Sequence, residues 1–256
     1  MLLILLAVGV LLAWLMSTPH GLLGKADAVG YAVCHRIDLR SFHLGERALP
    51  LCSRCTGMYL GTMVALGFLA VRGRLLAGRF PRRGILVLFG LLAAAFAVDG
   101  LNSYLGFFPG APRLYAPNNT LRLLAGTGLG LGLGTIVVPG FNQSVWTQVN
   151  PARSLGSWIE LCLLILAAVG VDLLVLTENP LLLYPLALVS SAGVVLLLTI
   201  VYTMLALLLT GRENKVAHPR QLLTPALVGF VLALLQIAGL DVVRFALTGT
   251  WEGFAL

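Results

Sequence analysis

Residues 181–209 read LLLYPLALVSSAGVVLLLTIVYTMLALLL, a long apolar run without one aspartate, glutamate, lysine or arginine. A run of roughly 20 apolar residues is enough to cross the hydrocarbon core of a bilayer as an α-helix. The run is continuous and does not alternate between apolar and polar residues, which favours a helix over the strand of a β-barrel. This stretch therefore predicts a transmembrane helix.

Further apolar runs of the same character extend across the rest of the chain. They cover residues 1–16, 56–71, 85–105, 120–138, 158–176 and 222–240. The first run is short, because a helix of its length rises only about 24 Å. No lysine or arginine precedes it and no small-residue cleavage site follows it. We therefore interpret it as a retained span and not as a cleaved signal peptide.

The composition agrees with a chain that lies largely in lipid. Of its 256 residues, 59% are hydrophobic and only 11% are charged, whereas a soluble domain carries roughly 25% charged residues. So few charges cannot cover a water-exposed surface of this size. We expect residues 1–256 to form one membrane domain, an all-α polytopic transmembrane helix bundle with about seven spans. Its location would be the cell membrane (the plasma or inner membrane), with the lipid bilayer as its surroundings.

Basic residues in short loops predict the orientation of the bundle. The densest positive cluster follows the second run and consists of Arg72, Arg74, Arg79, Arg82 and Arg83. The positive-inside rule places this loop in the cytoplasm, and alternation of the spans then makes residues 17–55 extracytoplasmic. The same rule accounts for the net charge of +7. No segment resembles a nucleic-acid-binding module, so we expect no nucleic-acid partner.

The predicted outer loop, where it enters the second span, concentrates sulfur and imidazole groups. It contains Cys34, His35, His43, Cys52 and Cys55, and these are side chains that a soft or borderline divalent metal prefers. The two-residue gap in Cys52-x-x-Cys55 lets both sulfurs face one ion. The pattern predicts a metal site, with zinc as the favoured ion. The fourth ligand would be His43, His35 or an open position, and His43 is sterically easier because His35 directly follows Cys34.

Two other interpretations of the cysteines remain open. Outside the cytoplasm cysteines often form disulfides. A disulfide of Cys34 with Cys52 or Cys55 could therefore link the loop to the second span, or the thiols could be inert. Alternatively, Cys52 and Cys55 could form a redox-active dithiol. The start of a helix and the neighbouring Arg54 would both lower a thiol pKa and favour the thiolate.

Ionisable residues inside the apolar runs predict a polar pocket near the cysteine loop. Asp99 and Arg122 lie within such runs, where an ionisable side chain is costly unless it is paired or faces water. Under the predicted topology both lie toward the outer ends of neighbouring helices, so we expect them to interact directly or through Asn119. The pocket would be formed by Asp99, Asn102, Asn119, Arg122, Tyr59 and Arg54. A purely structural ion pair that locks two helices is the alternative.

The motifs resemble those of an uncharacterised family of predicted prokaryotic integral membrane proteins, known only as a domain of unknown function. The resemblance covers residues 34–134. Its first part is the pattern Cys-His-x4-Arg-Ser-Phe followed by Leu-Pro-x-Cys-x-Arg-Cys-Thr-Gly-x-Tyr-x-Gly. Its residues are Cys34, His35, Arg40, Ser41, Phe42, Pro50, Cys52, Arg54, Cys55, Thr56, Gly57, Tyr59 and Gly61. The second part is Asp99-Gly100 with Asn119-x-x-Arg122. The resemblance implies the membrane fold but no activity.

Glycines at four-residue spacing predict close helix packing. Gly126, Gly130 and Gly134 share one helix face, and Gly57 and Gly61 share another. Such small-xxx-small faces let transmembrane helices approach closely. A nucleotide-binding loop is a poorer interpretation, because no strand precedes these glycines.

Three classes of function follow from these observations. The first is a metal-centred membrane protein, either an enzyme that uses metal-activated water or a protein with a structural ion. The second is a membrane thiol–disulfide oxidoreductase. The third is a transporter or a membrane-complex assembly subunit, in which Asp99 and Arg122 gate or dock. The site could handle a lipid headgroup, a quinone or a small polar solute. Because no hydrolase motif is present, no catalytic residue is assigned and the question of an enzyme stays open.

Overall fold

The computed structural model describes residues 2–108, 110 and 112–254. Its helices are α1 (Leu2–Ser17), α2 (Gly21–Val33), α3 (Ser53–Val71), α4 (Arg83–Leu105), α5 (Asn119–Val145), α6 (Trp158–Leu176), α7 (Pro180–Leu209) and α8 (Pro219–Thr248). Within these described residues, six helices are long and apolar enough to cross a membrane, and α1 with α2 adds a seventh if this bent pair is one span. The predicted all-α polytopic bundle is confirmed.

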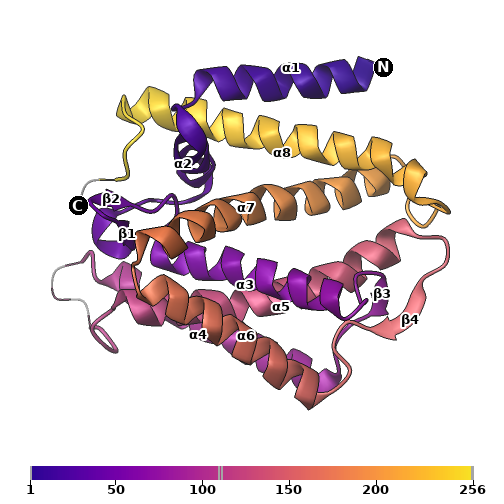
Figure 1. The fold of residues 1–256 in the computed structure, drawn as a ribbon, viewed down its shortest axis with the longest axis horizontal. Coiled ribbons are helices and arrows are strands. Elements are labelled where there is room, and N and C mark those ends of the chain that lie inside the picture. Colours follow the sequence, from indigo (N-terminus) through magenta and orange to yellow (C-terminus); the bar gives the residue numbers. More distant parts are fainter. Residues whose placement is uncertain (1, 109, 111, 255–256) are drawn as a thin grey trace.

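The N-terminal region contains a helix that the sequence pattern did not predict. Residues 17–55 were expected to be a loop, but they include α2, which is bent by 102° from α1. Figure 1 shows α1 running beside α8, with α2 turning away from its end toward α7. Lys25 and Asp27 interrupt the apolar pattern of α2, and for that reason its sequence reads as a loop.

Two of the predicted spans are longer than their apolar runs. Helix α5 continues past Val138 through Pro139, and α8 continues past Leu240 to include Asp241 and Arg244. In the α8 extension, the side chains of Asp241 and Arg244 have partners outside α8. Trp14 Nε1 donates to the Asp241 carboxylate at 3.3 Å, and Arg244 donates to backbone carbonyls at the end of α2. Such partners lower the cost of polar side chains near the membrane.

Short strands mark the two ends of the bundle. They are β1 (His43–Leu44), β2 (Arg47–Ala48), β3 (Ala77–Arg79) and β4 (Asn150–Arg153). Strands β1 and β2 form an antiparallel pair, and β3 and β4 form a parallel pair. Figure 1 places these pairs at opposite ends of the long helices. The cysteine-bearing loop (residues 34–52, between α2 and α3) and the arginine-rich loop (residues 72–83) therefore lie at opposite ends of the bundle.

Helices α3 and α5 pack together through glycine, as the small-residue pattern predicted. A Cβ atom on Gly126 would lie 2.1 Å from the carbonyl oxygen of Arg54. A Cβ atom on Gly130 would lie equally close, 2.1 Å, from the carbonyl oxygen of Met58. Only glycine permits backbones to approach this closely. This contact fixes the first turns of α3, which carry most of the candidate site.

Candidate metal centre

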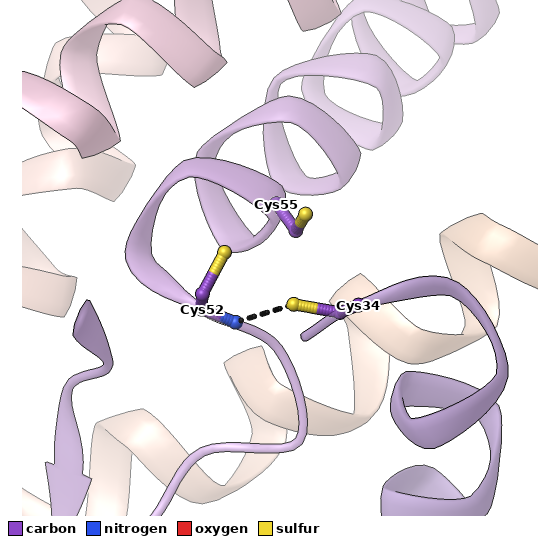
Figure 2. A group of neighbouring side chains, drawn as sticks. All are labelled: Cys34, Cys52 and Cys55. Atoms are coloured by element: carbon purple, nitrogen blue, oxygen red, sulfur yellow. Dashed lines mark hydrogen bonds between the residues drawn. The ribbon is translucent and has the colours of Figure 1, made fainter. Parts of the chain in front are cut away.

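Three cysteines from two separate elements meet at one end of the bundle. Cys34 follows the last residue of α2, Cys52 is the N-cap of α3, and Cys55 lies in the first turn of α3. Their Sγ atoms all lie within 4.8 Å of one another, and in the described part of the chain they are the one such group with metal-ligand chemistry. Figure 2 shows Cys34 directed toward the start of α3, where Cys52 and Cys55 lie.

Local packing explains why these sulfurs converge. A Cβ atom on Gly30 would lie 1.9 Å from the carbonyl oxygen of Pro50, so the chain before α3 rests directly on the last turn of α2. This approach allows the backbone N–H of Cys52 to donate to Cys34 Sγ at 3.3 Å (Figure 2). Cys55 follows Cys52 by three residues and therefore lies on the same helix face.

The sulfur cluster lies in an apolar environment. Cys34 is 6% exposed and Cys52 is 2% exposed, and Val29, Val194 and Ile237 belong to the same hydrophobic cluster. All cysteines within the described ranges are free thiols. Because water is largely excluded, charged sulfurs here require a counterion or hydrogen-bond donors.

Hydrogen bonding makes Cys34 the most acidic thiol of the cluster. The thiols of Cys52 and then Cys55 donate to its sulfur and hold the pKa of Cys34 well below its usual range, although burial opposes this effect. The thiolate is the form of cysteine that binds a metal or attacks a disulfide. Of the three sulfurs, that of Cys34 therefore has the environment that favours deprotonation.

Neither predicted histidine joins the sulfur group. His35 Nδ1 accepts a hydrogen bond from the backbone N–H of Ile37 at 3.0 Å, and burial lowers the pKa of His35. His43 Nε2 lies 3.0 Å from a carboxylate oxygen of Asp38. Three sulfurs that face one space fit a borderline metal such as zinc, and the fourth coordination position would then fall to another group.

The ionisable residues of the predicted pocket form a different pairing from the one expected. Arg54 Nε donates to the Asp99 carboxylate at 2.9 Å, and a second guanidinium nitrogen also donates to it. Tyr115 donates to the other carboxylate oxygen at 2.7 Å. Arg122 donates to Asn119 Oδ1 at 2.8 Å. The interaction of Asp99 with Arg122 was expected to be direct or through Asn119. In the described residues Asp99 instead pairs with Arg54, and Asn119 joins Arg122 to the carbonyl oxygen of Ser41 and not to Asp99.

The two asparagines of the predicted pocket hold loops in place. Asn102 accepts from the backbone N–H of Leu114 at 2.8 Å and donates to the carbonyl oxygen of Tyr115 at 3.0 Å. Asn119 donates to the carbonyl oxygen of Ser41 at 3.2 Å. These bonds anchor the α4–α5 loop and the cysteine-bearing loop to the ends of α4 and α5.

The cysteines and the ion pair lie on different sides of the first turns of α3. The cysteine cluster contacts α2, α7 and α8 and includes the half-buried Tyr59. The Arg54 side chain contacts Asp99 of α4, and its carbonyl oxygen lies against Gly126 of α5. Five predicted pocket residues thus gather on the α4–α5 side, whereas Tyr59 belongs to the sulfur side.

Sequence reasoning missed several polar partners. Tyr115 and Ser103 both contact the Arg54–Asp99 pair, and Arg244 of α8 donates to the carbonyl oxygen of Cys34 at 2.6 Å. Tyr115 lies in a loop, where sequence alone carries no signal of its contacts. Arg244 follows an apolar run that ends at Leu240, and the pattern does not show that α8 continues past this run and brings Arg244 against the carbonyl oxygens at the end of α2.

Comparisons with known proteins agree with the membrane fold and assign no activity. A family model described as a predicted membrane protein, DUF2085, matches residues 34–136. An uncharacterized protein of Methanothermobacter thermautotrophicus is 29% identical over 104 residues, which is 41% of this chain and 83% of that protein. An uncharacterized protein of Methanocaldococcus jannaschii is 25% identical over 121 residues, 47% of this chain and 71% of that protein. No solved structure matches. Over residues 34–136, the segment that carries the Cys34, Cys52 and Cys55 cluster and the Arg54–Asp99 pair, the chain therefore resembles an uncharacterised family of predicted prokaryotic membrane proteins.

Proposed function

We propose that this membrane protein holds one metal ion, zinc, on Cys34, Cys52 and Cys55. The observation that carries the proposal is the convergence of three Sγ atoms within 4.8 Å, from the end of α2 and the start of α3. A tetrahedral zinc with sulfur bonds of about 2.3 Å places its sulfurs roughly 3.5–4 Å from each other. Closing the present arrangement around an ion therefore requires only small side-chain movements.

The residues around the sulfurs suit a bound cation. Hydrogen bonds from the other two thiols hold the pKa of Cys34 below its usual range, and a metal would stabilise the deprotonated form of all three thiols. When bound, zinc supplies either a structural cross-link between α2 and α3 or, at an open fourth position, an acidic water. The backbone N–H of Cys52 donates to Cys34 Sγ at 3.3 Å, which would orient that ligand.

The proposed location of the site is the extracytoplasmic face of the cell membrane. The arginine-rich loop lies at the other end of the bundle (Figure 1), and the positive-inside rule assigns that loop to the cytoplasm. There Glu160 pairs with Arg72 at 3.1 Å and with Arg74 at 3.2 Å. These contacts anchor part of the positive cluster on α6.

Metal and sulfur analysis of the purified full-length chain tests the proposal. We expect close to one zinc per chain, lost on Cys52→Ser and retained on Cys162→Ser. Cys162 is an exposed thiol on α6 and serves as the matched control. A metal-free chain whose intact mass is about 2 Da lower than that of the reduced chain would show a disulfide. That outcome would reject the metal and favour the thiol–disulfide oxidoreductase.

A further inference from the structure

A cavity beside the polar network is lined by arginines. It has a volume of about 470 Å³ and lies between the cysteine-bearing loop and the ends of α4 and α5. Its lining residues are Leu39, Arg40, Ser103, Gly106, Phe107, Arg113, Pro117 and Arg122. The three arginines come from three separate segments of the chain, and their charges are directed at one space.

These arginines have no carboxylate partner among the described residues. The ion pairs found there do not include Arg40, Arg113 or Arg122. Asp99 is near, but its carboxylate already accepts hydrogen bonds from Arg54 and Tyr115. The cavity therefore carries an excess of positive charge.

Arg122 provides a second, independent observation that points to an anion at this cavity. The residue is 7% exposed, and its Nε is buried without a hydrogen-bond partner in the described part of the chain. Its one hydrogen bond there goes to Asn119, although a guanidinium carries five N–H donors. A buried cation with unused donors is costly unless an anion accepts them.

The other two arginines are held in place with donors to spare. Arg40 donates to the carbonyl oxygen of Ser103 at 3.2 Å, and its guanidinium carbon lies 4.1 Å from the centre of the Phe107 ring. Arg113 donates to the carbonyl oxygen of Gly106 at 2.9 Å. Burial, followed by repulsion from the Arg122 and Arg54 cations, lowers the pKa of Arg40. An anion in the cavity would relieve this repulsion.

We propose that this cavity binds a phosphate group, held by Arg40, Arg113 and Arg122. Planar guanidinium groups match phosphate oxygens with paired hydrogen bonds. The group could belong to a phospholipid headgroup or to free phosphate. Exposed apolar side chains beside the cavity favour the lipid, since Leu39 is 79% exposed and Leu114 is 77% exposed. This inference does not depend on the metal.

Lipid retention by the purified full-length chain tests the proposal. Native mass spectrometry would compare phosphatidylglycerol with a diacylglycerol of the same acyl chains, which lacks the phosphate. Arg113→Gln and Arg122→Gln should each weaken phosphatidylglycerol binding by about tenfold or more, because a charge-assisted hydrogen bond is lost. Arg220→Gln is the control, because Arg220 is an exposed residue at the start of α8, at the opposite end of the bundle.

Three results separate the outcomes. Loss of phosphatidylglycerol in the two cavity variants only, with no retention of diacylglycerol, supports a lipid phosphate. Thermal stabilisation by sodium phosphate that the same variants abolish supports free phosphate. Equal binding of both lipids by all variants, with no effect of phosphate, overturns the proposal. Arg113 is exposed, so its variant should fold even if Arg122→Gln does not, and zinc content should be unchanged in both.

Discussion

Removing the Asp99 carboxylate should leave the Arg54 guanidinium as an unpaired cation inside the bundle. The side chain of Arg54 is 14% exposed and that of Asp99 is 4% exposed, so water cannot fully replace the lost partner. Breaking a buried pair from one side costs roughly 3–5 kcal/mol. We therefore expect Asp99→Leu to lower the free energy of unfolding by about that amount.

The double variant distinguishes an ion pair from two independent contributions. Arg54→Met with Asp99→Leu removes both charges, so it should be less destabilised than the sum of the single variants, with a coupling of about 1–3 kcal/mol. Arg122→Met with Asp99→Leu is the matched cycle. Its coupling should be smaller, below about 1 kcal/mol, because the guanidinium of Arg122 donates to Asn119 and not to the carboxylate.

The assay is unfolding of the detergent-solubilised chain by sodium dodecyl sulfate, followed by circular dichroism. Both cycles are measured under identical conditions, so that differences between variants do not depend on the reference state. Additive effects of Arg54→Met and Asp99→Leu would contradict the contact. A larger coupling for Arg122 than for Arg54 would instead restore the pairing predicted from sequence.

Three further predictions concern orientation, packing and pH. Cysteine-accessibility mapping should place residues 72–83 in the cytoplasm, and labelling of that loop from outside would reverse the proposed orientation. Gly130→Val should destabilise the bundle by about 2 kcal/mol or more, because its Cβ would lie 2.1 Å from a carbonyl oxygen of α3. Gly67→Ala is the control and should be nearly neutral, because the space around Gly67 is open. Equal unfolding midpoints for the two variants would refute the packing argument. Burial and the hydrogen bond to Asp99 raise the pKa of Tyr115 in the folded chain. The protonated Tyr115 hydroxyl therefore stabilises the fold at pH values below the unfolded tyrosine pKa of about 10. This stabilisation is lost as the pH rises through the higher pKa of the folded state. Tyr115→Phe should remove this alkaline step from a pH series of unfolding midpoints, and a step of unchanged size would exclude Tyr115 as its origin.

The membrane spans could be predicted because lipid imposes one simple requirement on the chain. Every backbone polar group in the bilayer needs an internal partner, so a long apolar run must be helical. The same rule does not predict where a helix ends once its apolar run is over. Asp241 and Arg244 continue α8 because Trp14 and the carbonyl oxygens at the end of α2 accommodate them, and these partners lie far away in sequence.

Only part of the candidate site could be predicted from the sequence. Residue chemistry was enough to group the cysteines, since few thiols occur in the chain and Cys52-x-x-Cys55 fixes two of them on one helix face. The partner of Asp99 could not be chosen, because Arg54 and Arg122 both lie near the same end of their helices. The glycine contact of α3 with α5 sets the rotation that directs Arg54 to the carboxylate.

The first turn of α3 also determines how the metal and the anion relate to each other. Successive residues of a helix are rotated by about 100°, so Cys52 and Cys55 lie on one face while Arg54, between them, faces another. The sulfurs contact α7 and α8, and Arg54 contacts α4. Arg54 also donates to Ser103, which lines the arginine cavity, so a phosphate there would lie on the α4–α5 side and an ion on the sulfurs would lie on the side of α7 and α8. The two ligands would share no binding residue. A variant that loses the metal should therefore keep the anion, and a variant that loses the anion should keep the metal.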